Sequence, residues 1–148
     1  MTAIRFYLVR HGRAESRGAG DDALRRLTAE GRARFAAHAR AVAPRLAVSR
    51  VATSPLARAR ETAGLLAVAT RAGVEELGAL ASGASSGRGL LELGRRLGAG
   101  AALVGHNPEI AEAVALAAGR SLDVPPGTIA AIDSEDDRFR LAWIEAPG

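Results

Sequence analysis

The sequence predicts a three-layer α/β/α sandwich built on a mostly parallel six-stranded sheet with one antiparallel strand. Short apolar runs alternate with helix-like segments along most of the chain, which is the pattern of parallel strands joined by crossover helices. Near the C-terminus, two strand-like segments flank the acidic turn SEDD and predict an antiparallel hairpin. The chain has 148 residues, without a repeat or a linker, so we expect a single domain over residues 1–148.

Each predicted element has a local signal in the sequence. Strands are expected at the short apolar runs, residues 4–9, 49–53, 74–77, 101–105, 127–133 and 138–146. Helices are expected at residues 29–43, 55–73, 88–97 and 108–119. Thr28 is a suitable N-cap for the first helix, and Pro44 ends it. Ser54–Pro55 and Asn107–Pro108 each place a capping side chain before a proline, which is favoured at the first helical position.

The composition excludes several classes of protein. The chain is 48% hydrophobic and 24% charged, which is typical of a globular protein and not of a disordered one. We expect no membrane partner and a cytoplasmic location, because no apolar run is long enough to span a bilayer or resembles a secretory signal. There is no cysteine, so disulfides and thiolate metal sites are excluded. We expect no metal and no other cofactor.

All 20 basic residues are arginine, and the formal net charge is +4. Guanidinium groups suit phosphate or carboxylate binding, but a coding preference for arginine and alanine is the favoured explanation of the uniformity. The arginines are scattered through every segment, and aromatic residues make up only 3% of the chain. A nucleic-acid partner is therefore not expected, since it would call for a concentrated basic face with stacking aromatics.

Unusual polar residues stand at three junctions between a strand and a helix. These are Arg10-His11-Gly12, Arg58 one turn into the second helix, and His106-Asn107 after the fourth strand. In open parallel sheets, ligands bind beyond the carboxyl ends of the strands, where all three junctions meet if their strands are neighbours. Two helix N-termini would add positive dipole ends there. The combination predicts a site for a compact dianion such as a phosphoryl group.

Each of these residues also has a structural explanation when taken alone. His11 could end a strand, His106 could bond the end of a helix, and Arg58 could face solvent. Their coincidence at the ligand-binding ends of three strands favours a functional site. His38 has no partner in these motifs, so we expect it at the surface.

The segments LVRHGRAE, TSPLARARETA and LVGHNPEI resemble the three signature blocks of the histidine phosphatase superfamily, which has the phosphoglycerate-mutase-like fold. Between them, DDALRRLTAEGRARFA is similar to a segment of the SixA-type phosphohistidine phosphatases. The resemblance spans residues 4–110 in the family's order, and the short chain points to the SixA branch. It implies one histidine phosphatase domain.

The resemblance implies that His11 is the nucleophile and forms a phosphohistidine intermediate. Arg10 and Arg58 would hold the phosphoryl oxygens and His106 would complete the pocket, with Gly12 and Asn107 contributing to substrate binding. This chemistry is physically reasonable. Nearby guanidinium groups disfavour protonation of the imidazole that has to attack, and phosphoryl transfer mainly requires positioned cations.

A dedicated general acid is the feature that this sequence lacks. Larger members of the superfamily place a carboxylate in a central insertion, which is short here; Glu75 and Glu76 are the candidates in that region, and Glu15 is another. Solvent is the remaining proton source. Solvent is sufficient for an imidazole leaving group but not for an alkoxide. With the open site that a missing cap suggests, this favours phosphohistidine on a protein as the substrate.

Two further interpretations remain open. The protein could be a phosphatase of small phosphorylated metabolites from the same superfamily. It could also be a non-catalytic phosphate-binding or scaffolding domain, against which the complete set of Arg10, His11, Arg58 and His106 argues.

Overall fold

The computed structural model describes residues 3–18 and 20–148. The strands are β1 (Ile4–Arg10), β2 (Arg50–Thr53), β3 (Gly73–Glu76), β4 (Ala101–Gly105), β5 (Ile129–Glu135) and β6 (Arg138–Glu145). The α-helices are α1 (Ala29–Val42), α2 (Ala57–Thr70), α3 (Gly87–Leu97) and α4 (Glu109–Ala118). Three short 3-10 helices are η1 (Asp22–Leu24), η2 (Ala43–Arg45) and η3 (Gly78–Leu80).

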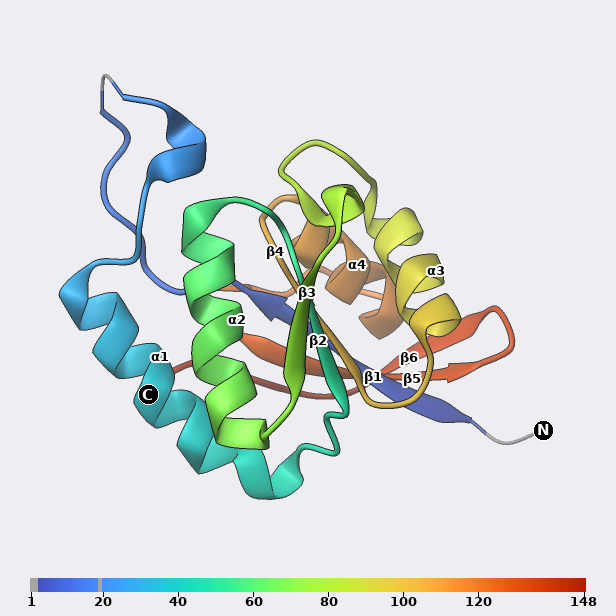
Figure 1. Ribbon diagram of the computed structural model, residues 1–148. Helices are drawn as coiled ribbons and strands as arrows, with labels where there is room; N and C mark the ends of the chain where they lie inside the picture. Colours follow the sequence, from blue (N-terminus) through green and yellow to red (C-terminus); the bar gives the residue numbers. More distant parts are fainter. Residues whose placement is uncertain (1–2, 19) are drawn as a thin grey trace.

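The six strands form one sheet in the order β3-β2-β4-β1-β5-β6 (Figure 1). The pairs β3–β2, β2–β4 and β4–β1 are parallel, whereas β5 is antiparallel to both β1 and β6. Only β5 therefore runs against the other described strands. This is the predicted fold class, a mostly parallel six-stranded sheet with one antiparallel strand.

Helices cover both faces of the sheet. The side chains of β1 alternate between the two faces, and in the middle of the strand both sets are apolar and buried. Phe6 and Leu8 belong to a buried cluster that includes Leu90 of α3 and Ile110 of α4. Tyr7, Val9 and the neighbouring strands instead pack against side chains of α1 and α2. The two helix pairs lie on opposite sides of the sheet in Figure 1. The prediction of three layers is confirmed.

The helix starts follow the predicted signals only in part. Thr28 caps α1, with its side chain accepting a hydrogen bond from Gly31 N. Asn107 Oδ1 accepts from Ala111 N, and α4 begins at Glu109, one residue later than expected. The expected start of the second helix at Pro55, with Ser54 as its cap, is wrong, because α2 begins at Ala57 with Leu56 in the N-cap position.

The placement of His38 at the surface is also wrong. Its ring is buried and its Nε2 lies 3.1 Å from the backbone carbonyl of Glu145, on β6.

A separate finding concerns membranes. Among the described residues, no helix combines the length and the apolar character needed to cross a bilayer.

Candidate active site

The sheet order brings the three polar junctions together. β1, β4 and β2 are neighbours, with Arg10 paired to Gly105 and Thr53 paired to Val104 at their carboxyl ends. Beyond the strands, His11 N donates to Gly105 O at 3.0 Å. The residues that follow the three strands therefore lie at one edge of the sheet, as the sequence predicted.

A pocket of about 500 Å³ opens at this edge. It is lined by Arg10, His11, Arg13, Ala14, Arg17, Arg25, Arg58, Ser82, His106, Asn107 and Pro126. All the predicted site residues except Gly12 are among them. Gly12 lines an adjoining cavity of about 180 Å³, and its N–H is bonded to Thr62 Oγ1 at 2.9 Å. The structure thus gives Gly12 a place beside the pocket and not in its lining.

His11 is held in a single tautomer by its own backbone neighbour. Its Nδ1 lies 2.7 Å from the carbonyl oxygen of Gly12, which can only accept a hydrogen bond. Nδ1 therefore carries the proton, and the neutral ring has its lone pair on Nε2. Burial, with smaller contributions from the charges of His106, Arg58 and Arg10, lowers the pKa of His11 from 6.5 to about 3. At neutral pH the ring is therefore uncharged.

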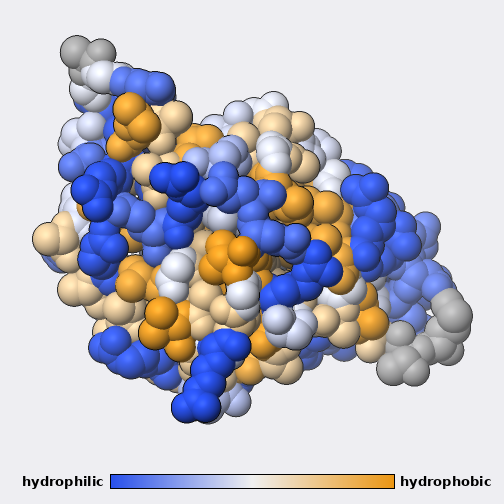
Figure 2. All heavy atoms as spheres, viewed as in Figure 1, coloured by the Kyte–Doolittle hydropathy of each residue, from blue (hydrophilic) through white to orange (hydrophobic). Residues whose placement is uncertain are grey.

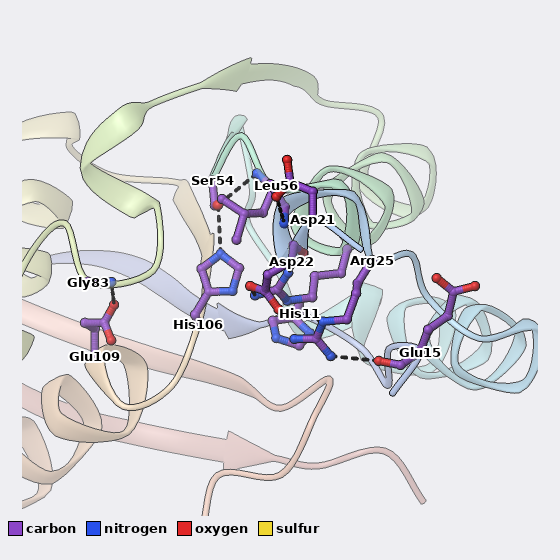
Figure 3. A network of polar contacts seen from close by, with 12 residues as sticks. His11, Glu15, Asp21, Asp22, Arg25, Ser54, Leu56, Gly83, His106 and Glu109 are labelled. Atoms are coloured by element: carbon purple, nitrogen blue, oxygen red, sulfur yellow. Dashed lines mark hydrogen bonds and ion pairs between the residues drawn. The ribbon is translucent and has the colours of Figure 1, made fainter. Parts of the chain in front are cut away.

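His106 lies against His11, with the two ring centroids 5.1 Å apart. Its Nε2 is 2.7 Å from Ser54 Oγ, so the other ring nitrogen, Nδ1, lies toward His11 (Figure 3). Nδ1 is buried and has no hydrogen-bond partner in the described part of the chain. Burial, followed by the charge of Arg58, lowers the pKa of His106 to about 4.

The two predicted arginines are fixed on the pocket wall by main-chain and carboxylate contacts. Arg58 is only 3% exposed; its Nη1 donates to Asp22 O at 2.9 Å and its Nη2 to Asp22 Oδ2 at 3.1 Å. Arg10 Nη1 donates to Val124 O at 2.9 Å. Burial lowers the pKa of both groups, but guanidinium stays charged in proteins. The Nε atoms of both are buried without a partner among the described residues.

Asn107 contributes to the pocket mainly through its position. Its Nδ2 donates to Val124 O at 3.1 Å, while its Oδ1 binds the first turn of α4. Both ends of the amide are therefore engaged. Asn107 and Arg10 hold the same carbonyl, which ties the loop before β5 to the pocket.

None of the candidate general acids reaches the pocket. Glu15 Oε1 accepts from the backbone N–H of Arg26, and its carboxylate points away from His11 in Figure 3. Glu75 pairs with Arg50, Glu76 lies 3.8 Å from Arg60, and neither lines the pocket. Among the described residues, no carboxylate lines the pocket.

Sequence reasoning missed several residues of the site, chiefly Arg13, Arg17 and Arg25 on the loop between β1 and α1. Arg25 stands in the segment DDALRRLTAEG, whose resemblance to SixA-type enzymes was noted without a role for this residue. Arg13 and Arg17 carry no motif signal, because only the folding of the loop brings them to the pocket. Ser54 is predicted only as a helix cap. Its Oγ accepts from Leu56 N and also lies 2.7 Å from His106 Nε2.

The donor set favours anion binding over metal binding. Within residues 3–18 and 20–148, no group of three or more histidine, cysteine, aspartate or glutamate side chains is arranged to hold a metal ion. Five arginines and two histidines line the pocket instead. Fold and site together define a class of protein: an α/β/α domain with a partly buried, neutral histidine among arginine cations.

Comparison with known proteins identifies the family. The model of the histidine phosphatase superfamily (branch 1) matches residues 6–83, and the chain belongs to this superfamily. None of the curated proteins matches the chain in sequence. The superfamily assignment makes the protein a phosphatase of the hydrolase class.

Solved structures agree with this assignment. A protein assigned as phosphohistidine phosphatase SixA from Agrobacterium tumefaciens is 25% identical, with a TM-score of 0.85 over 97% of this chain and 98% of that chain. The protein histidine phosphatase SixA in complex with tungstate is 21% identical, with a TM-score of 0.82 over 97% of each chain. A mycobacterial glucosyl-3-phosphoglycerate phosphatase is 20% identical, with a TM-score of 0.69 over 95% and 98%.

Proposed function

We propose that the protein removes the phosphoryl group from phosphohistidine on a protein, through a phosphohistidine intermediate on His11. One observation carries the proposal. The partly buried His11, whose ring is unprotonated, lines the same pocket as Arg10, Arg58 and His106. Arg10 Nε, Arg58 Nε and His106 Nδ1 are three buried nitrogens without partners among the described residues. Buried donors are nearly always satisfied, so a ligand with several acceptor oxygens fits this place.

The reaction has two steps on the same nitrogen. The lone pair of His11 Nε2 attacks phosphorus; the N–P bond forms as the bond from phosphorus to the leaving group breaks. Water then attacks phosphorus, the N–P bond breaks, and phosphate leaves with His11 restored. Arg10 and Arg58 bind the equatorial oxygens, where charge spreads in the transition state. His106 Nδ1 adds a third hydrogen bond in the tautomer in which Ser54 Oγ donates to Nε2. The two guanidinium cations of Arg10 and Arg58 supply the charge that a metal ion supplies in other phosphoryl-transfer enzymes.

The substrate class follows from the missing acid. No carboxylate lines the pocket among the described residues, so a protonated side chain is not at hand to neutralise an alkoxide. The imidazole of phosphohistidine leaves as a neutral ring once its nitrogen takes a proton from water. The similarity to two SixA structures over nearly the whole chain supports this choice.

A second candidate is a phosphatase of small metabolites. A pocket of about 500 Å³ is large enough for a small ligand, and the similar mycobacterial enzyme is a glucosyl-3-phosphoglycerate phosphatase. A panel of phosphohistidine proteins and of sugar, glyceryl and nucleotide phosphates separates the two candidates. A clear preference in kcat/KM for free metabolites would replace the first proposal by the second.

The mechanism is tested by His11→Ala, measured on an aryl phosphate. We expect turnover to disappear, because the nucleophile is lost, and an acid-labile phosphoryl label to appear on the native protein only. His38→Asn is the matched control, since it removes the histidine outside the pocket, and it should keep the label. Chelation of divalent ions should leave activity unchanged. Full activity of His11→Ala contradicts the mechanism; tight vanadate binding without turnover of any substrate indicates a non-catalytic phosphate-binding domain.

A further inference from the structure

The pocket holds more positive charge than one phosphoryl group requires. Arg10 and Arg58 already face the place where we put the phosphoryl group, and Asp22 is paired with Arg58 and Arg25. Arg13 and Arg17 also line the pocket, and neither makes a side-chain hydrogen bond or ion pair within the described residues. Two guanidinium groups are thus left without a counter-charge.

These two arginines stand on a loop whose backbone is well fixed at Arg13. Arg13 O accepts from Thr28 N at 3.0 Å, and the neighbouring Ala14 forms a β-bridge with Leu27. Hydrophilic residues lie along this loop, which projects at the upper left of Figure 2. The side chains of Arg13 and Arg17 are exposed, so a large partner can reach them.

Arg25 also lines the pocket and is held in place. Its Nε donates to Asp22 Oδ1 at 2.8 Å and its Nη1 to the backbone oxygen of Glu15 at 2.7 Å. Arg13 also forms part of the adjoining cavity, together with Pro126, which lines both hollows. Arg13 therefore lies where the pocket and the adjoining cavity meet.

We propose that Arg13 and Arg17 bind a second anionic group of the substrate, which on a phosphohistidine protein is an aspartate or glutamate side chain close to the phosphohistidine. The proposal rests on the proposed phosphatase function of the same pocket. Guanidinium forks bind carboxylates with two hydrogen bonds, and carboxylates are the anionic side chains that an unmodified protein segment offers. Such contacts also steer an acidic partner toward the site.

The experiment compares two phosphohistidine peptides, one with acidic and one with neutral residues beside the phosphohistidine. We expect native protein to show a kcat/KM about tenfold higher for the acidic peptide, from two exposed charge pairs. The double variant R13Q/R17Q should lose this preference, and added salt should weaken it in the native protein. R96Q is the matched control, because it removes an exposed arginine from α3, outside the pocket, and it should keep the preference.

Two aryl phosphates, with and without a ring carboxylate, are measured in the same variants. Equal kcat/KM values of the native protein within both substrate pairs, or a preference that survives in R13Q/R17Q, would overturn the second anion site. If neither peptide is hydrolysed, only the proposal of a phosphohistidine substrate is overturned. The two aryl phosphates then test the second anion site. In that case a preference for the carboxylated ring supports a small anionic metabolite as its source.

Discussion

Two hydroxyl groups hold the residues of the proposed reaction in place. Ser54 Oγ accepts from Leu56 N and bonds His106 Nε2, so one side chain sets both the turn before α2 and the ring orientation. Thr62 Oγ1 accepts from Gly12 N and donates to Arg58 O. The loop after β1 is thereby locked to α2. Removing either hydroxyl would leave a buried polar partner unsatisfied, which is the costly form of hydrogen-bond loss.

The titration of His11 is a prediction at the scale of the residue. Burial lowers its pKa from 6.5 to about 3, so the native ring should stay neutral where an ordinary histidine is charged. During acidification the unfolded chain takes up the proton first, and the native state loses stability as pH falls from 6.5 toward 3. Above this range the ring is neutral in both states and contributes no pH dependence.

An NMR titration of the ring carbon Cε1 measures this pKa, with the His11 signal assigned by its absence in His11→Ala. The acidic limb of the pH profile of kcat/KM, which reports on the free enzyme, should have the same low pKa after correction for the titration of the substrate's own phosphate. A midpoint near 6.5 would show that the ring is solvated and would remove the electrostatic reason for its nucleophilicity.

At the scale of the element, helix α1 fixes the loop that carries Arg13. Gly31 lies so close to this loop that a β-carbon built on it would stand 2.2 Å from Arg13 O. Glu61 of α2 accepts from Leu27 N and from Arg26 and Arg32, which binds the end of the same loop. The loop between β1 and α1 is therefore attached to both helices on that face of the sheet.

We expect Gly31→Ala to push this loop away from α1 and to destabilise the protein by about 1–3 kcal/mol, as overpacking usually does. The free energy of unfolding is measured by denaturant titration. The control is Gly64→Ala in α2, where an added β-carbon meets nothing within 4 Å. That change should stabilise the helix by about 0.5–1 kcal/mol. Equal effects of the two variants would mean that the contact with Arg13 carries no weight.

The elements and junctions of this fold could be predicted from the sequence because their signals are local. Apolar runs, the Thr28 cap and the residues after each strand are read over a few positions, and the parallel topology then brings the junctions together. The start of α2 was misplaced because Ser54 bonds a histidine that is distant in sequence. His38 is buried, contrary to the prediction, because the backbone of β6 lies against its ring. The loop arginines carry no sequence signal, because only tertiary folding brings them to the pocket.

At the scale of the whole molecule, the two buried clusters share one sheet. Phe6 and Tyr7 are neighbours in β1 but belong to clusters on opposite faces. The side chains of β4 are buried on both faces as well. Because the same strands support both layers of helices, we propose that the chain unfolds as one domain.

This proposal is tested with one core truncation on each face, Leu66→Ala in α2 and Leu90→Ala in α3, both almost fully buried. Each should lower the free energy of unfolding by about 2–5 kcal/mol. The single Trp143 reports on the α1–α2 face, where its ring packs against Tyr7 at a centroid distance of 6.2 Å, while far-ultraviolet circular dichroism reports on the whole chain. For one cooperative domain, both probes shift together in both variants. If Leu90→Ala shifts the dichroism but leaves the Trp143 transition in place, the two faces unfold separately, and the single-domain proposal is wrong.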